Sequence, residues 1–589
     1  MAVLTGLLMT LATIGYARDD LPNVIVFLSD DQGWGDFSFV GNPNLSTPHL
    51  DSIAEDGAVF ENFFVCPVCS PTRAEFLTGR YHVRSGVWGT GGAGRERLDL
   101  DERTIAEAFQ AAGYKTAAFG KWHNGTQAPY HPNSRGFEYF YGFCSGHWGN
   151  YFSPILEENG EIVRGQGYVT DDFTERAIAF IEANQAEPFF VYIPYNTPHS
   201  PMQVPDAYWS RFKNKTIQPA DRGADKENLA HTRAALAMCE NIDWNVGRVL
   251  KRLDDLKLAD KTIVVYFCDN GPNGWRWNDG LKGTKGSTDE GGVRSPLLLR
   301  FPGKVDAGKR IKTLAGVIDL HPTLLDLTGV GQDRKNTFDG ISLVRPILDD
   351  SLSPEIASGF KRHLFSHWAG RVSVRTAEYR LDHRGQLFDI VADPGQRMPV
   401  NNSRVEVAND LREAVVHWRK EVLSELEHAP KRPFTVGHES LSLTQLPARD
   451  ATATGDIRRS NAAPNCSYYT NWTSTADTIS WPVNVLTTAK YEVELYYSCA
   501  AENIGATIEL SGSGGSVSKR ISEAHDPPSR GAENDRFARR ESYVKDFKPT
   551  KMGEVQLQQG LGQLVLKSVK IPGDESIDFR LLTLRRIAE

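Results

Sequence analysis

A cysteine at the start of a predicted helix is the clearest candidate for a reactive residue in this 589-residue chain. Pro71 favours the first helical turn, which places Cys69 at a helix N-terminus, where unpaired N–H groups and the helix dipole favour negative charge. Arg73 lies one turn further along and can reach the same spot. The full stretch reads Cys69-Ser70-Pro71-Thr72-Arg73-Ala74-Glu75-Phe76-Leu77-Thr78-Gly79-Arg80.

Oxygen-bearing side chains follow two predicted strands. Asp30 and Asp31 end the apolar strand 23–28, and Asp269-Asn270 follow the strand 262–268. Such hard oxygen donors suit calcium or magnesium rather than zinc. Taken alone, either pair is more often a strand-end turn or a helix cap.

Basic side chains follow further predicted strands. Lys121 and His123 close the strand 116–119, and His199 comes after the strand 189–194. Lys285 lies in a glycine-rich loop, a feature that is weak evidence by itself. Any one of these residues alone could equally be a solvated surface group.

Together, these motifs resemble the type I sulfatases of the alkaline phosphatase superfamily. In that family a cysteine in C-x-P-x-R, followed by L-T-G-R, is oxidised to formylglycine. The resemblance covers roughly residues 22–430. The motifs described above occur in the same order as in the family, which favours a functional role for each of them. Two positions depart from the pattern: Asn124 stands where the family has an apolar residue, and Ser295 where valine is common.

The resemblance implies a metal site and a set of catalytic residues. It implies that calcium, with magnesium the less favoured choice, is bound by Asp30, Asp31, Asp269, Asn270 and the modified Cys69. Lys121 would bind the formylglycine oxygen or the sulfate, and His123 would take the proton that triggers sulfate release.

His199 and Lys285 complete the implied site, with Arg73 beside the modified cysteine. His199 resembles the sulfate-binding histidine that is also a candidate general acid toward the leaving oxygen. Lys285 resembles the lysine that grips the bridging oxygen of the sulfate.

Formylglycine would give covalent catalysis with a built-in release step. One hydroxyl of the hydrated aldehyde attacks sulfur and displaces the alcohol, and the other then loses its proton and ejects sulfate. A formylglycine-generating maturation enzyme is therefore an implied partner. An unmodified Cys69 thiol is the alternative, because helix N-termini activate thiols generically.

Alternation of short apolar runs with helical patterns predicts an α/β fold. Predicted helices at 104–112, 171–183 and 228–256 each lead into a strand. This order favours a large, mostly parallel sheet flanked by helices, and such sheets place ligands at the carboxyl ends of their strands.

The pattern changes toward the C-terminus. We expect the catalytic α/β domain at 22–350 and a small α+β subdomain at 351–430, with a strand at 386–390 and a helix near 408–426. A proline-marked linker, 431–447, would follow.

Alternating apolar and polar residues from 448 to 589 predict a β-sandwich. It could bind carbohydrate through Tyr468, Tyr469, Trp472 and Trp481, although aromatic residues in a sandwich more often form its core. Residues 512–518 read as a Gly/Ser loop.

Composition excludes some functions. A net charge of -8 argues against nucleic-acid binding, which requires a basic surface. Residues 1–17 read as a signal peptide, which predicts a secreted, periplasmic or extracellular protein with no membrane span; a misplaced start or a disordered leader is the alternative.

The chain has seven cysteines, so at least one of them cannot be part of an intramolecular disulfide. Assigning Cys69 to chemistry leaves six, of which Cys466 and Cys499 form an attractive disulfide. Free buried thiols remain an equal alternative for the others.

We therefore expect a sulfuric ester hydrolase whose substrate is a sulfated carbohydrate, with aryl sulfates as model substrates. Two other functions stay open. One is a formylglycine-dependent phosphodiesterase or phosphonate monoester hydrolase. The other is a non-catalytic glycan-binding protein on a sulfatase frame.

Overall fold

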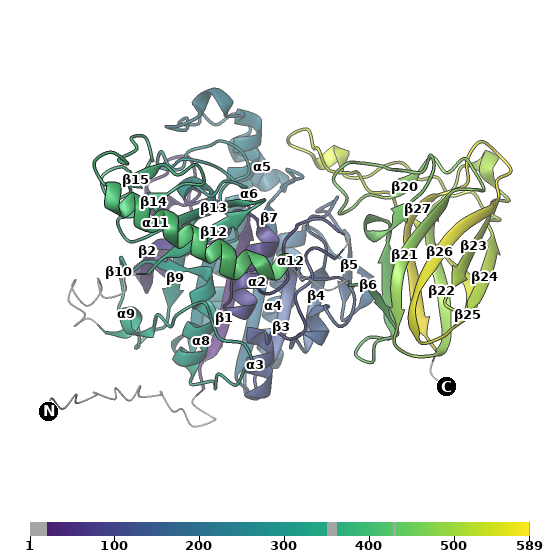
Figure 1. Ribbon diagram of the computed structural model, residues 1–589, viewed down its shortest axis with the longest axis horizontal. Helices are drawn as coiled ribbons and strands as arrows, with labels where there is room; N and C mark the ends of the chain where they lie inside the picture. The colour runs from purple at the N-terminus through teal and green to yellow at the C-terminus, as the bar shows by residue number, and fades with distance from the viewer. Residues whose placement is uncertain (1–20, 93, 350–361, 428–431, 588–589) are drawn as a thin grey trace.

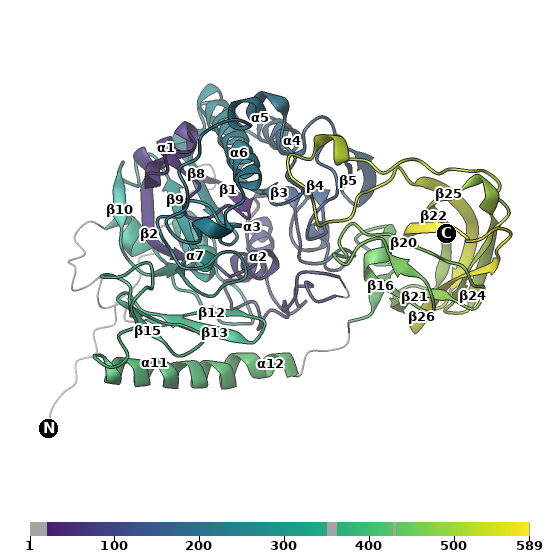
Figure 2. The ribbon, with the colours of Figure 1, turned by 90° about the horizontal axis from the view of Figure 1, so that it is seen from above.

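The computed structural model describes residues 21–92, 94–349, 362–427 and 432–587 (Figure 1). An α/β unit and a β-sandwich lie side by side, and the small subdomain lies against the α/β unit (Figure 2). The predicted signal peptide falls outside the described residues. Within them, no helix is both long and apolar enough to span a bilayer.

Eleven strands of the described chain form one mixed sheet, whose central five are mutually parallel. In spatial order the strands are β10 (Lys309–Ile311), β2 (Ala58–Phe64), β9 (Arg294–Arg300), β8 (Thr262–Cys268), β1 (Asn23–Asp30), β7 (Phe189–Pro198), β3 (Lys115–Lys121), β4 (Tyr139–Phe143), β5 (Ile155–Glu158) and β6 (Glu161–Arg164), with β11 (Ala315–Gly316) beside β2. The parallel run is β8-β1-β7-β3-β4, so the carboxyl ends of these strands meet at one edge of the sheet.

Helices cover both faces of this sheet, because apolar side chains of β1 point alternately to the two faces and both sets must be buried. Ile25 and Phe27 face one core, whereas Val24, Val26 and Leu28 face the other. The first core is covered by α1 (Pro48–Glu55), α4 (Val169–Ala183), α5 (Asp206–Phe212) and α6 (Leu229–Asp255); the second by α2 (Cys69–Thr78), α3 (Ile105–Ala111), α8 (Leu320–Thr328) and α9 (Val344–Leu348). The α/β prediction is confirmed.

A four-stranded antiparallel sheet follows in the chain. It consists of β12 (Leu364–Trp368), β13 (Arg371–Arg375), β14 (Tyr379–Leu381) and β15 (Leu387–Asp389). Helix α11 (Val405–Trp418) buries Ala408 and Leu411 against it. The helix continues through a π-turn (Arg419–Leu423) into α12 (Ser424–Glu427), close to the end expected from the sequence.

Two sheets packed face to face form the C-terminal sandwich. The first holds β16 (Phe434–Val436), β18 (Thr452–Ala453), β21 (Thr478–Val485), β23 (Thr507–Gly512), β24 (Gly515–Arg520) and β26 (Gly560–Lys570). The second holds β17 (Leu443–Pro447), β19 (Arg458–Arg459), β20 (Tyr469–Thr470), β22 (Ala489–Ser498), β25 (Lys548–Leu557) and β27 (Asp578–Arg586). Their inward side chains form one apolar core.

Two expectations for this region differ from the structure. Strands β16 and β17 lie within the segment 431–447 that was expected to be a linker, and they pair with β21 and β27 of the sandwich. The expected Gly/Ser loop at 512–518 is largely strand, with a tight turn at Ser513 and Gly514 joining β23 to β24.

The expected disulfide between Cys466 and Cys499 is absent, since all seven cysteines are free and buried. The two sulfur atoms contact different carbonyl groups: Cys466 Sγ lies 3.4 Å from Ser542 O, and Cys499 Sγ lies 3.4 Å from Ala500 O.

The aromatic residues suggested as sugar-stacking groups serve mainly as core. Trp472, Trp481 and Tyr469 are buried in the sandwich interior. Tyr468 is half-buried and packs its ring edge to face with Phe547 at 5.2 Å. These positions leave no aromatic platform among the four.

Candidate active site

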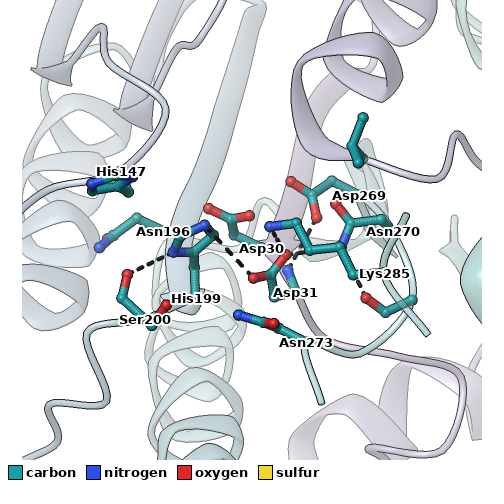
Figure 3. A network of polar contacts seen from close by, with 12 residues as sticks. Asp30, Asp31, His147, Asn196, His199, Ser200, Asp269, Asn270, Asn273 and Lys285 are labelled. Carbon is teal, nitrogen blue, oxygen red and sulfur yellow. Dashed lines mark hydrogen bonds and ion pairs between the residues drawn. The ribbon is translucent and has the colours of Figure 1, made fainter. Parts of the chain in front are cut away.

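The carboxyl ends of β1, β3, β7 and β8 bring together the polar residues singled out in the sequence. Asp30 ends β1 and Lys121 ends β3, while His199 and Asp269 come directly after β7 and β8. Because the four strands are parallel neighbours, residues far apart in the chain meet at one edge. Figure 3 shows part of this cluster around Asp31.

Cys69 is the first residue of α2, and every residue of that helix is buried. The preceding residue is extended and offers no side-chain cap, so the first N–H groups of α2 remain open toward the site. Burial raises the pKa of the Cys69 thiol, although Lys121 and Lys285 act to lower it. An unmodified Cys69 would therefore be a poor thiolate at neutral pH.

Arg73 ties α2 to the strand ends. Its Nη2 donates to Asp269 Oδ2 at 2.9 Å, and its Nη1 donates to the backbone oxygen of Lys121 at 2.6 Å. The guanidinium and the Asp269 carboxylate are fully buried. Arg73 therefore holds Asp269 and the end of β3 in place beneath Cys69.

Three buried oxygen atoms converge without hydrogen-bond donors. Asp30 Oδ1, Asp31 Oδ2 and Asn270 Oδ1 accept no hydrogen bond from any described residue. Ligand atoms of Asp30, Cys69 and Asp269 also lie within 4.8 Å of one another. Buried oxygens without donors are costly unless a cation binds them, so this cluster fits a divalent ion with oxygen ligands.

The same carboxylates are crowded by like charge. Burial and repulsion from Asp30 raise the pKa of Asp269 to about 7. The pKa of Asp31 is lowered, because attraction to Lys285 and His199 outweighs the effect of burial. A bound cation would relieve this repulsion, which is a second reason why the cluster fits a metal.

Two lysines reach into the cluster, and each approaches a different carboxylate. Lys121 Nζ lies 2.5 Å from Asp30 Oδ2, and Lys285 Nζ lies 2.5 Å from Asp31 Oδ1. The pKa of Lys285 is raised despite its burial, because the carboxylates of Asp31 and Asp30 favour the charged form. Lys285 therefore stays cationic at neutral pH, as an anion-binding group must.

His199 is oriented for a role through its Nε2 atom. Its Nδ1 lies 2.6 Å from Ser200 O, which can only accept, so Nδ1 carries the proton. The Nε2 atom lies 3.7 Å from Asp31 Oδ2 (Figure 3). Burial and the nearby Lys285 lower the pKa of His199, which favours the neutral ring before an anion binds.

His123 is held beside α2 in a strained backbone conformation, with φ at 61°. Ser70, next to Cys69, donates a hydrogen bond to the His123 carbonyl at 2.9 Å. The ring Nε2 lies 3.0 Å from Thr90 O, which leaves Nδ1 as a buried acceptor with no partner among the described residues. Burial, followed by Lys121, lowers the pKa of His123 well below its ordinary value.

The sulfatase family profile matches residues 22–330, which is more than half of the chain. This chain belongs to the sulfatase family. It is a type I sulfatase of the alkaline phosphatase superfamily, and therefore a sulfuric ester hydrolase.

Individual relatives agree with this assignment. The chain is 29% identical to the N-acetylgalactosamine-6-sulfatase of Sus scrofa over 66% of its own length and 84% of the relative. It is 30% identical to arylsulfatase A of Bos taurus, with 70% and 90% covered. The solved structure of Ps i-CgsB in complex with k-i-k-neocarrahexaose has a TM-score of 0.60 and 28% identity, covering 68% of this chain and 92% of that one.

The structure adds residues of this sulfatase that sequence reasoning missed. His147, after β4, stacks on His199 with ring centroids 5.8 Å apart. Its Nδ1 lies 3.1 Å from the side-chain nitrogen of Asn465, which belongs to the sandwich. Asn196 lies beside the pair (Figure 3). Recognising strand 139–143 would have pointed to His147, but no sequence signal pointed to Asn465.

A buried triad anchors the loop that carries Lys285. Glu290 Oε1 accepts from Arg375 Nε at 2.9 Å and from Arg380 Nε at 2.8 Å. The arginines come from β13 and β14, so the subdomain grips the short helix α7 (Glu290–Val293) that follows the lysine loop. These arginines outweigh the effect of burial and lower the pKa of Glu290 to about 2.

We expect Glu290→Gln to destabilise the sulfatase by about 3–5 kcal/mol, because it leaves two buried guanidinium groups without a counter-charge. Since the folded pKa of Glu290 is depressed, its contribution is present above about pH 4.5 and is lost as pH falls toward 2. Urea denaturation at pH 7 measures the first effect, and a series that continues below pH 4.5 toward the folded-state pKa measures the second.

The exposed Glu187→Gln is the matched control and should change stability by less than about 0.5 kcal/mol. Equal stability of the Glu290→Gln variant and the wild type at pH 7 would contradict the anchoring role of Glu290.

Proposed function

We propose that this sulfatase hydrolyses sulfate esters of carbohydrates, with a formylglycine made from Cys69 as its nucleophile and Ca²⁺ as its metal. The observation that carries the proposal is the convergence of Cys69, buried donor-free oxygens and two lysines at one sheet edge. A nucleophile, a cation site and anion-binding groups are the parts that attack on an anionic ester requires.

Asp30, Asp31, Asp269 and Asn270 would hold the metal. Their oxygen donors suit Ca²⁺, with Mg²⁺ a less favoured choice. When bound, the ion would supply positive charge that draws electrons from the sulfate oxygens and from the nucleophile.

The lysines would bind the sulfate group, because both ammonium groups lie beside the carboxylates that would hold the metal. An incoming anion also favours the imidazolium form of His199, whose Nε2 could then protonate the leaving oxygen. His123 Nδ1 is a buried acceptor with no partner, which suits it to take the proton whose loss ejects sulfate.

A carbohydrate substrate is supported by two relatives. One is named N-acetylgalactosamine-6-sulfatase, and the other was solved in complex with k-i-k-neocarrahexaose. The predicted signal peptide would place the enzyme outside the cytosol, and a formylglycine-generating enzyme would be its maturation partner.

Paired rate measurements test the reaction class. We expect kcat/KM on an aryl sulfate to exceed that on an aryl phosphate diester by at least about 100-fold, because the two groups of candidate ligands at the described site share Asp30 and so form one cluster rather than two separate metal sites. Equal or higher rates on the phosphate diester would instead favour a phosphodiesterase or phosphonate monoester hydrolase.

A further inference from the structure

The sandwich reaches the catalytic unit through the 521–547 segment, which joins β24 to β25. Figure 2 shows this segment leaving the sandwich and extending toward α4 and α5. Gln203 Nε2 donates to Gly531 O at 2.7 Å, and Arg536 N donates to Met202 O at 2.9 Å. The 521–547 segment is therefore fastened to the chain that directly follows His199.

Further contacts fix the segment in place. Arg539 is nearly fully buried, pairs with Asp535 at 2.6 Å and donates to Gly149 O. Ser200, the residue after His199, donates a hydrogen bond to Glu541. The sandwich is thus positioned at the edge of the active site itself.

A cavity of about 540 Å³ lies between the 521–547 segment and the catalytic unit. Its size is in the range of small-molecule sites, which often form at domain interfaces. Ser200 and Asn273 place it next to the catalytic cluster, where Asn273 lies beside Asp31 (Figure 3). A group attached to a bound sulfate ester could therefore extend into the cavity.

The lining of the cavity combines aromatic and cationic groups with one carboxylate, that of Glu541, which accepts a hydrogen bond from Ser200. Trp275, Phe537 and His231 supply apolar surface, and the Phe537 and His231 rings meet edge to face at 5.3 Å. Lys226 lies over the Trp275 ring at 4.9 Å, and Arg540 is exposed on the opposite segment. Among the described residues, neither cation has a carboxylate partner in an ion pair, whereas the adjacent Arg539 does.

We propose that this cavity is a glycan subsite in which Lys226 and Arg540 bind a second anionic group, a sulfate or carboxylate, on the sugar next to the scissile ester. The inference rests on the proposed carbohydrate sulfatase function. Apolar ring surface suits the face of a sugar, and unpaired cations suit its anionic substituent. The sandwich therefore selects substrate through the 521–547 segment rather than through the aromatic residues of its core.

Binding to the full-length Cys69→Ala protein tests this subsite without turnover. The probes are two galactan tetrasaccharides that carry the same terminal sulfate and differ by one sulfate on the neighbouring sugar. We expect the doubly sulfated probe to bind at least about tenfold more tightly, and Lys226→Ala or Arg540→Ala to reduce that ratio about fivefold each. Arg540→Lys should keep part of it.

Arg520→Ala, an exposed arginine in β24, is the matched control and should leave the ratio unchanged. Equal binding of the two probes, or equal losses for both probes in the Arg540→Ala variant, would overturn the subsite. Failure of the wild type to hydrolyse either probe, with the binding ratio intact, would instead count against the proposed function and leave the subsite supported.

Discussion

Cys69→Ala is expected to lower kcat on an aryl sulfate by at least about 10⁴-fold, because it removes the nucleophile while the rest of the site remains. Substrate binding should persist, since the lysines and His199 are unchanged. Steady-state rates and calorimetric binding on the same preparation separate the two effects.

Cys66→Ala is the matched control, because Cys66 is also buried and lies three residues earlier in the chain. Its kcat should stay within about threefold of wild type once the folded fraction is accounted for. Turnover by the Cys69→Ala variant at a rate comparable to that of the wild type would contradict the assignment of position 69 as the nucleophile.

Cys69→Ser separates the aldehyde hydrate from a simple hydroxyl nucleophile. A serine has one hydroxyl, so it can attack sulfur but cannot eject sulfate by reforming an aldehyde. A preparation that retains serine should therefore accumulate a covalent sulfate ester, about 80 Da heavier, and stop after one turnover. Continued turnover would argue against release through the second hydroxyl.

Removal of divalent cations is expected to have the second-largest effect. Chelation with EDTA should lower kcat/KM by about 10³-fold, and added Ca²⁺ should restore it. The physical reason is the cluster of buried oxygens at Asp30, Asp31 and Asn270 that accept no hydrogen bond from the described residues.

The metal site also predicts an effect on stability. Ca²⁺ at 100 times its dissociation constant should stabilise the folded protein by about 2.7 kcal/mol, measured as a rise in Tm. Asp30→Asn should lose most of this rise, whereas the exposed Asp333→Asn should keep it. Unchanged activity after chelation, together with no rise in Tm, would contradict the metal site.

Local patterns predicted the α/β framework well, because each central strand is an apolar run whose period is visible in the chain. The strand at 262–268 matches β8, and the helix at 228–256 differs from α6 by one residue at each end. Asn228 caps α6 by accepting hydrogen bonds from two backbone N–H groups. Asparagine is a favoured N-cap residue, so the start of this helix could be predicted from the sequence.

Long-range contacts were not predictable in the same way. His147 stacks on His199 and also contacts a side chain from the sandwich, Asn465, which lies more than 300 residues later in the chain. The start of the sandwich was missed because Pro433 and Pro447 read as a linker, although β16 and β17 complete the two sheets there. Contacts between residues so far apart in the chain cannot be identified from one sequence without its structure.

Mass spectrometry of the 62–75 peptide, released by cleavage after Glu61 and Glu75, tests the central claim most directly. The protein should come from a host that carries the maturation enzyme. We predict that position 69 is about 18 Da lighter than cysteine and reacts with a hydrazide, while Cys66 in the same peptide remains a thiol that can be alkylated. Two alkylated cysteines in a fully active preparation would contradict the formylglycine mechanism.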